Sequence, residues 1–434
     1  MKERFFTRKV KLTFPKMMSL ILKKSTKSIQ NSLNDMQLEM RKMNPKENYS
    51  ITNSAYTQAR AKLSYTAFDE LSEKTVELFY RDGEYHKYKG FRLLAIDGSI
   101  VILPNSEDIK KEFNPIIAKC GKKGYSKEVI QSRVSVLYDV LNNIAIDASI
   151  NNQILDKTNP KLKAKDERSL ALEHLEYCNK KDLVICDRGY PSYKLFVKYG
   201  LKSNFLMRIQ KSTSLEAKLL FNANNKEKDI VVEIKAPSRI KAELKQLKLP
   251  IKMKIRFIQV ILNDGTVEVL ATNILSKKIL KTEDFKELYA KRWGIETYYD
   301  VLKNRLSLEN FTGKTALAIR QDFHATIFLT NYESMLVYDS NLELLDKSKS
   351  NNYAQKVNKA VSFNAIKHEA FNIFYGSEDL ATQMEQLKEL FLMNTVLVRP
   401  NRKTPPRLDK SKYSSSIAHK AVQFLKRKKK SVGN

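Results

Sequence analysis

Two aspartates and one glutamate have the residue types and positions that suit metal-dependent chemistry. Asp97 and Asp187 each end an apolar, strand-like run, and a glycine follows closely after each. Such a run is typical of a buried strand that carries a carboxylate to the open end of a sheet. Glu296 lies farther along the chain, in a helix-like stretch. Together they are the ligands that a two-cation phosphoryl-transfer site needs, because hard divalent cations bind carboxylate oxygens and a pair of them stabilises the attacking and leaving oxygens.

The helix-like stretch around Glu296 carries other polar residues on the same face. At about 100° per residue, Tyr289, Arg292, Glu296 and Lys303 fall within an arc of about 60° on one predicted helix. An apolar stripe overlaps and flanks this arc, so the polar residues lie at the edge of the buried face. Taken alone, such a stretch is more often a surface helix in which Arg292 and Glu296 form an i,i+4 pair. The two aspartates are what favour a functional interpretation.

Convergence of the three carboxylates would require cations nearby. Two unit charges about 4 Å apart repel each other by about 4 kcal/mol at an effective dielectric near 20, so the groups need metal ions or raised pKa values. Mg²⁺ suits a site built from carboxylates and phosphates. A nucleophile activated by metal needs no protein base, which agrees with five scattered histidines that lack ligand spacing. The three cysteines show no zinc or disulfide pattern either.

On these residues, the sequence resembles bacterial insertion-sequence transposases with a DDE catalytic triad, of the insertion-sequence-four family. That family carries a Tyr-x2-Arg-x3-Glu-x6-Lys signature, which Tyr289, Arg292, Glu296 and Lys303 match without a gap. The residues around Asp97 and around Asp187 match the two aspartate-containing blocks of that family. The resemblance extends from about residue 50 to about residue 375.

The resemblance implies a function and a role for each residue. It implies a cut-and-paste transposase that binds the terminal inverted repeats of its element, cleaves the strands there and joins them to target DNA. It further implies a homodimer on double-stranded DNA, and two Mg²⁺ ions for which Mn²⁺ can substitute. The catalytic and metal-binding residues would be Asp97, Asp187 and Glu296, and the residues that grip DNA phosphates would be Tyr289, Arg292 and Lys303.

Two other functions remain open at this point. One is a metal-dependent nuclease with the same core and no strand transfer, and the other is a relic protein that binds DNA without cutting it. The complete carboxylate set argues against the relic. Arg188 and Arg208 are weaker candidates for DNA contact, and Trp293, the one tryptophan, is predicted to pack structurally rather than to stack on a base.

Composition points to a polyanionic partner. The chain of 434 residues has 78 Lys and Arg against 48 Asp and Glu, a net charge of +30. An excess of this size is typical of proteins that bind nucleic acid. No stretch approaches the ~20 apolar residues of a membrane span, and the N-terminus does not resemble a secretory signal. We therefore expect a cytoplasmic protein with no membrane partner, and the resemblance implies that it is bacterial and nucleoid-associated.

The order of predicted elements gives the fold class, α/β with a ribonuclease-H-like catalytic core interrupted by a β-rich insertion, and with helical N-terminal and C-terminal regions. A strand, a hairpin, a helix, a strand, a helix and a strand succeed one another, which puts Asp97 and Asp187 on adjacent strands. The predicted divisions are a DNA-binding helical domain over 1–88, a core over 89–210 and 276–338, an insertion over 211–275, a C-terminal helical region over 339–398 and a basic flexible tail over 399–434.

Several local predictions can be compared directly with a structure. A turn is predicted to break the strand just after Asp97, and residues 105–130 are predicted to form a polar loop. The stretch 289–303 is predicted to be one helix, and 313–338, 351–375 and 378–396 three more. Arg60 and Lys62, between short helices near the N-terminus, are placed in the DNA-binding region, although a helical cap with solvated charges is about equally compatible with this stretch.

Overall fold

The computed structural model describes residue 6 and residues 11–24, 28–43, 45, 49–81, 84–120, 125–152, 165–349, 352–375 and 379–399. The α-helices are α1 Phe14–Lys23, α2 Ile29–Met43, α3 Asn53–Arg60, α4 Thr66–Arg81, α5 Glu107–Lys110, α6 Glu167–His174, α7 Tyr193–Lys202, α8 Ser238–Gln246, α9 Asp284–Ala290, α10 Trp293–Asp300, α11 Ala316–Leu336, α12 Tyr338–Lys347, α13 Lys359–Tyr375 and α14 Leu380–Met393. The strands are β1 Arg92–Leu103, β2 Pro115–Cys120, β3 Tyr125–Asp139, β4 Ile144–Asn152, β5 Asp182–Cys186, β6 Asn204–Ile209, β7 Asp229–Lys235, β8 Lys252–Ile261, β9 Val267–Thr272, β10 Ala354–Val357 and β11 Thr395–Val398.

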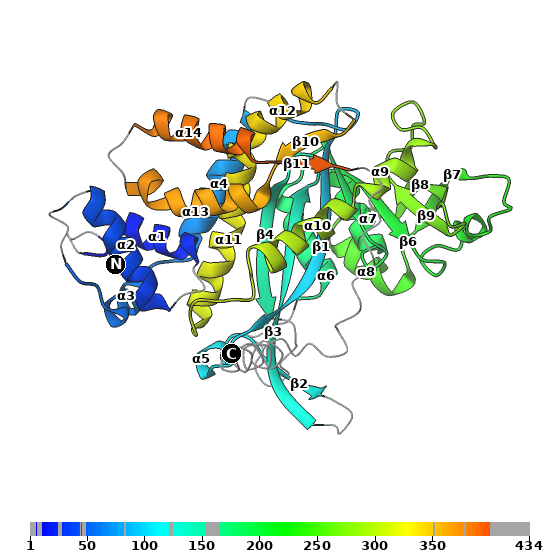
Figure 1. The fold of residues 1–434 in the computed structure, drawn as a ribbon. Helices are drawn as coiled ribbons and strands as arrows, with labels where there is room; N and C mark the ends of the chain where they lie inside the picture. The colour runs from blue at the N-terminus through cyan, green and yellow to red at the C-terminus, as the bar shows by residue number, and fades with distance from the viewer. Residues whose placement is uncertain are drawn as a thin grey trace, which may run out of the picture.

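A mixed sheet forms the centre of the molecule (Figure 1). Its core order is β4-β3-β1-β5-β6, in which β3 runs antiparallel to both β4 and β1, while β1, β5 and β6 are parallel. This is the order and direction of a ribonuclease-H-like sheet, so the predicted fold class is confirmed. The pairing of Ile96 with Cys186 makes β1 and β5 neighbours at the residues that precede Asp97 and Asp187.

Each face of the two central strands packs against its own helices. Side chains alternate between the faces of a strand, and both strands are buried on both sides. One face, formed by Leu94, Ile96, Val184 and Cys186, belongs to the hydrophobic cluster that includes α6 and α7. The other, formed by Leu93, Leu183 and Ile185, packs with α9. Asp97 and Asp187 continue the second series, and this directs them toward the helices that come after the insertion.

The predicted β-rich insertion extends the core sheet and does not form a separate one. β9 pairs with the core strand β6 in antiparallel fashion, and β8 and β7 continue outward from β9. In Figure 1 these strands lie on the right of the core, whereas α1, α2, α3, α13 and α14 lie on its left. The core strands therefore separate the insertion from the terminal helices.

The structure contradicts several local predictions. β1 is continuous through Leu103, with no turn after Asp97, because Gly98 and Ser99 keep their pairing with β3. The predicted polar loop contains α5, β2 and the beginning of β3. The stretch 351–375 begins with β10 before α13, and 378–396 contains α14 and the start of β11. Residues 121–124 of that loop and residues 400–434 of the predicted tail lie outside the described residues.

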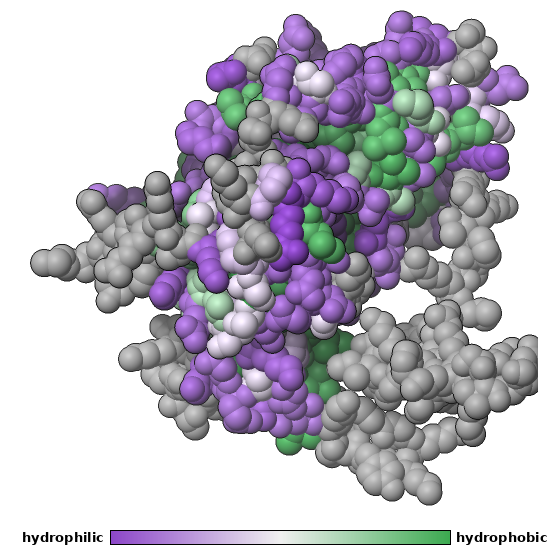
Figure 2. Space-filling view, turned by 60° about the vertical axis from the view of Figure 1, so that its left-hand side comes forward, coloured by the Kyte–Doolittle hydropathy of each residue, from purple (hydrophilic) through white to green (hydrophobic). Residues whose placement is uncertain are grey.

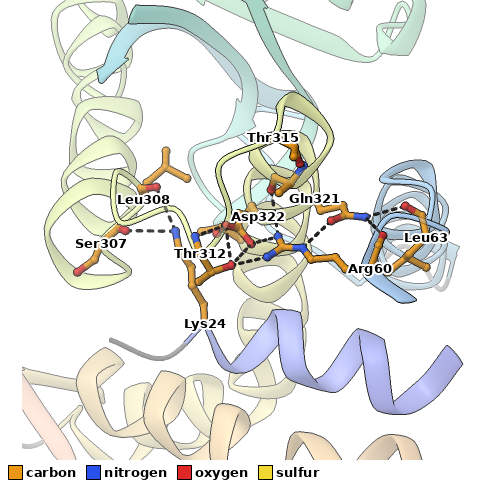
Figure 3. A network of polar contacts seen from close by, with 11 residues as sticks. Lys24, Arg60, Leu63, Ser307, Leu308, Thr312, Thr315, Gln321 and Asp322 are labelled. Atoms are coloured by element: carbon orange, nitrogen blue, oxygen red, sulfur yellow. Dashed lines mark hydrogen bonds and ion pairs between the residues drawn. The ribbon is translucent and has the colours of Figure 1, made fainter. Parts of the chain in front are cut away.

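Arg60 is buried and is not a surface cation (Figure 3). Its Nη2 lies 2.7 Å from Oδ1 of Asp322, a fully buried aspartate on α11, and its Nε donates to Gln321 at 2.7 Å. Asp322 also accepts a hydrogen bond from the backbone N–H of Thr312 at 2.6 Å. Nearby, Lys24 Nζ donates to the carbonyl of Leu308 at 3.0 Å. These contacts tie the N-terminal helices to α11 and to the loop before it, so Arg60 is a buried structural residue, and the DNA-binding role of the N-terminal helices stays a prediction.

Among the coloured residues of the face shown in Figure 2 most are hydrophilic, and hydrophobic ones gather toward its upper right. Among the described helices, none is long and apolar enough to cross a membrane.

Candidate active site

The two predicted aspartates lie side by side at the centre of the sheet. Asp97 is in the middle of β1, and its Oδ1 accepts the N–H of Gly98 at 2.9 Å. Its own carbonyl oxygen accepts the hydroxyl of Tyr299 at 2.8 Å, which holds α10 against β1. Asp187 directly follows β5, the parallel neighbour of β1. Strand pairing thus fixes the separation of these two carboxylates before any helix is added.

Glu296 reaches the same site from α10. The predicted helix 289–303 is interrupted in the structure: α9 ends at Ala290, α10 begins at Trp293, and a π-helical turn spans Val301–Arg305. The backbone between α9 and α10 stays close to helical, so Tyr289, Arg292 and Glu296 still share one side. The π-helical turn is the larger departure, because each such turn holds one extra residue and rotates the residues beyond it about the helix axis.

Two arginines lie among the carboxylates. Arg292 Nη2 is 2.8 Å from Glu296 Oε1, and the arginine side chain is only 5% exposed. Arg208, on β6, places Nη2 2.7 Å from Asp187 Oδ1 and also pairs with Glu268. The Nε atoms of both arginines are buried and have no hydrogen-bond partner in the described structure. These unused donors are suited to an anionic group entering the site, such as a phosphate.

The electrostatic environments of the two aspartates differ. Burial raises the pKa of Asp97 to about 6, helped by the charges of Glu296 and Asp187 and opposed by the Gly98 N–H and Arg292. Burial also raises the pKa of Asp187. The Arg188 N–H and the charges of Arg208 and Arg292 have a larger, opposite effect, so the pKa of Asp187 lies below its usual value. Positive charge is therefore concentrated around Asp187, and Asp97 has less of it.

The structure places the remaining signature residues at the edges of this site. The Tyr289 hydroxyl donates to Asp187 Oδ1 at 3.3 Å. Lys303, in the π-helical turn, donates from Nζ to the carbonyl of Ile100 at 2.7 Å. Burial lowers the pKa of Lys303. This lysine contacts β1 three residues beyond Asp97, and it does not join the other signature residues around Asp187.

Trp293 is exposed, contrary to the predicted packing role. Its exposed fraction is 60%, the largest departure for any residue singled out near the site. Its ring lies 5.0 Å from the guanidinium carbon of Arg292, a cation–π distance. Trp293 is the first residue of α10, and its side chain is exposed to solvent instead of packing in the core.

A fourth carboxylate, Glu167, was not identified from the sequence as a site residue. It is the first residue of α6, where the Asp166 side chain accepts the Ser169 N–H at 2.7 Å as the helix cap. A Cβ on Gly98 would lie 3.3 Å from its Cγ, and a Cβ on Gly189 would lie 3.6 Å from its Oε2. Glu167 therefore lies over both glycines that follow the aspartates. The one sequence signal for it was its position in a polar helix start between the two aspartate strands.

Glu167 is held in place by β3 and by a buried polar chain along α6. Its Oε1 is 2.5 Å from Arg133 Nη1. At the other end of α6, His174 bridges Ser135 Oγ at 2.9 Å and Asp147 Oδ2 at 2.6 Å. Ser135 and His174 are both 1% exposed, so this serine and histidine are enclosed and fix α6 on the sheet, whereas Asp147 is partly exposed.

The donor types of the site fit a divalent cation, although the side chains are not arranged as a ligand cage. Carboxylate oxygens are the preferred ligands of Mg²⁺, and burial, together with the charges of Glu296 and Asp187, raises the pKa of Asp97. Within the part of the chain that the structure describes, no three His, Cys, Asp or Glu side chains are placed to hold one ion. Arg208 and Arg292 occupy carboxylate oxygens that an ion would share.

The fold and the position of these carboxylates define a protein of the ribonuclease-H-like class. Its particular family follows from a family model, described as the transposase DDE domain, that matches residues 88–332, more than half of the chain. The chain therefore belongs to the DDE transposase domain family, whose members are in general metal-dependent enzymes that cut DNA. The finer assignment to the insertion-sequence-four family stays a prediction.

Two other comparisons add little. No curated protein sequence matches the chain. A cryo-EM structure of a piggyBac transposase synaptic complex with hairpin DNA is similar at a TM-score of 0.42 and 10% identity, covering 96% of this chain and 83% of that one. A likeness at that level is too low to support an argument about this chain.

Proposed function

We propose that this chain is a cut-and-paste DNA transposase. It binds the terminal inverted repeats of its element, cleaves the strands at the repeat boundary and joins the freed 3′ ends to target DNA, as a homodimer that bridges both ends. The observation that supports this proposal is that Asp97 lies on a strand directly beside the one that ends at Asp187, and that the charges of Asp187 and Glu296 both act on Asp97. Membership in the DDE transposase domain family is the reason to interpret these three carboxylates as metal ligands for DNA cleavage.

In this proposal the three carboxylates bind two Mg²⁺ ions, and Mn²⁺ can replace them. When bound, such ions stabilise the attacking and leaving oxygens of an in-line displacement at phosphorus. The protein must then redirect its arginines, because Arg208 and Arg292 now pair with Asp187 and Glu296. Released from the carboxylates, the two guanidinium groups can bind the phosphate oxygens beside the scissile bond.

The other residues position the DNA end. Tyr289 can donate its hydroxyl to a phosphate oxygen in place of Asp187, and Lys303 can add a point charge at the β1 edge. Trp293 offers an exposed ring beside Arg292, and an exposed aromatic ring in a basic surface can stack on a base. We assign these three residues to the DNA flanking the scissile phosphate.

A strand-cleavage assay tests the proposal. The purified protein is incubated with a labelled duplex that carries the inverted repeat flanking its gene, with Mg²⁺ or with EDTA. We expect cutting at the repeat boundary with Mg²⁺ alone, and its loss in Asp97→Asn, Asp187→Asn and Glu296→Gln. Glu287→Gln is the matched control, because this carboxylate is exposed on α9 and pairs only with Lys291 in the described structure.

The assay also separates the proposal from its rivals. Cutting by Glu296→Gln at the wild-type rate would remove Glu296 from the catalytic set. A second, unlabelled duplex tests strand transfer, because a transposase joins the 3′ end to it and a nuclease leaves the end free. Tight binding without cutting, on paired ends as well as on a single duplex, would favour a relic binding protein.

A further inference from the structure

A basic groove lies beside the Asp187 loop, between the core and the insertion. It has a volume of about 570 Å³ and is bounded by the start of α7, the loop that follows β6, and the segment joining β7 to α8. One carboxylate, Glu216, lines it, and Ser214 donates a hydrogen bond to that carboxylate at 2.7 Å. Five cationic side chains line it: Arg168, Arg188, Lys194, Lys235 and Arg239.

Three of the five cations have no protein partner among the described residues. Lys194 pairs with Glu243 at 2.5 Å, and Arg168 donates from Nε to the carbonyl of Gly189 at 3.0 Å. The side chains of Arg188, Lys235 and Arg239 are exposed and form neither an ion pair nor a hydrogen bond within the described part of the chain. Unneutralised cations gathered on one concave surface create a local positive potential that attracts a polyanion.

Neutral donors in the groove fit the same kind of ligand. Ser192 caps α7 by accepting the Leu195 N–H, and Ser192, Tyr193 and Lys194 all line the groove, so the positive end of this ten-residue helix opens into it. Ser212 and Thr213 add hydroxyl groups from the loop after β6. Helix N-termini, hydroxyls and arginines together are the groups that contact the phosphates of DNA.

The groove lies close to the proposed catalytic aspartate, because Arg188, which lines the groove, directly follows Asp187 in the chain. Lys235 and Arg239 lie at its far side, on the insertion. We infer that this groove holds the backbone of the DNA duplex where it continues past the scissile phosphate, outside the inverted repeat. This surface is separate from Tyr289 and Lys303, and the inference rests on the proposed transposase function.

Salt-dependent binding tests the inference with a matched pair of variants. The first variant is Lys235→Ala with Arg239→Ala, which removes two groove cations far from the catalytic residues. The control is Lys241→Ala with Lys245→Ala, which removes two exposed cations from α8 that do not line the groove. The affinity of each protein is measured by fluorescence anisotropy at several salt concentrations, with a duplex that carries the inverted repeat and two helical turns of flanking DNA.

The expected result is a shallower salt dependence in the groove variant alone. Each phosphate contact contributes about 0.9 to the slope of log K against log salt concentration, so the loss of two contacts lowers the slope by about 1.8. On a second probe that ends at the repeat boundary, the groove variant should match the wild type. Equal slopes for groove variant, control and wild type on the long probe would overturn the inference, as would an equal loss on both probes.

The same proteins separate a failure of this inference from a failure of the proposed function. If the wild type cuts at the repeat boundary and the groove variant has an unchanged slope, only the inference fails. If the wild type does not cut with Mg²⁺, the proposed function fails, and the slopes still report whether the groove binds DNA. Urea unfolding of both double variants verifies that the exposed substitutions leave the fold intact.

Discussion

Replacing Asp97 with asparagine should stabilise the metal-free protein at neutral pH. The fold raises the pKa of Asp97 from 3.8 to about 6, first through burial and then through Glu296 and Asp187. The ionised side chain is therefore less favourable in the folded protein than in the unfolded chain, and the difference amounts to about 3 kcal/mol at most. Because Asp97 is only partly buried, we expect about 1–3 kcal/mol. Asparagine removes the charge and can still accept the Gly98 N–H.

The predicted gain depends on pH in a defined direction. Below pH 3.8, Asp97 carries a proton in both the folded and the unfolded state, so the substitution does not change the free energy of unfolding through charge. Between 3.8 and about 6 only the folded state retains the proton, and the wild type loses stability as the pH rises. Above about 6 the full difference is present. The gap between Asp97→Asn and wild type should therefore open from about pH 4 to about pH 6 and stay constant above it.

Urea unfolding in EDTA, followed by circular dichroism at several pH values, measures this gap. Asp229→Asn is the matched control, because it should change the free energy of unfolding in the opposite direction. Burial opposes ionisation of Asp229, but hydrogen bonds from Arg256 and Thr282 lower its pKa, and Arg256 Nη2 lies 2.6 Å from its Oδ2. That substitution should destabilise the protein at neutral pH. An Asp97→Asn variant less stable than wild type at about pH 7.5, or a gap that ignores pH, would refute the electrostatic account. Mg²⁺ should narrow the gap, because an ion bound by the carboxylates stabilises only the wild type.

Three further predictions concern individual cations. Arg60→Ala should lower the free energy of unfolding by about 3–5 kcal/mol, because it leaves Asp322 buried and unpaired; Lys62→Ala, on the surface nearby, should change it by less than about 0.5 kcal/mol in the same urea titration, and equal effects would contradict the network. Lys303→Ala should lower the salt slope of DNA-end binding by about 0.9, and an unchanged slope would show that Lys303 does not contact the backbone. Burial lowers the pKa of Lys24 from 10.5 to about 8, so wild-type stability should rise between about pH 8 and about pH 10 as the folded state releases its proton first; a rise of equal size in Lys24→Met would assign it to another group.

The sequence was sufficient for the parts of the fold that depend on local pattern and order. Strands before Asp97 and Asp187 are apolar runs, and their order along the chain determines which of them pair. The hairpin between β3 and β4 was predictable from its alternation around Asn142 and Asn143. The buried position of Cys186 follows from the same strand pattern. The strands and the hairpin are each encoded within a few residues, whereas the pairing of the two aspartate strands, Ile96 with Cys186, follows from the order of the elements.

Other features depend on contacts between distant segments, and the sequence pattern did not reveal them. Arg60 has the appearance of a surface cation until α11 brings Asp322 to within 2.7 Å of it, 262 residues along the chain. Gly98 suggested a turn, but the strand continues through it because Gly98 pairs with β3. The side chain of Glu167 lies over Gly98, in the space that a side chain at that position would need. Trp293 was predicted to pack structurally, but its side chain is 60% exposed and lies beside Arg292.

The charge balance of the site links its present arrangement to the proposed reaction. The cations nearest the carboxylates are arginines of the chain itself, and they satisfy Asp187 and Glu296 while Asp97 has less compensation. A divalent ion and a phosphate carry opposite charges, so both could enter the site with little change in its net charge. The ion would take over the carboxylates, and the arginines would transfer to the phosphate. In the proposed reaction the same exchange would give a partner to the buried Nε atoms of Arg208 and Arg292, which have none in the described structure.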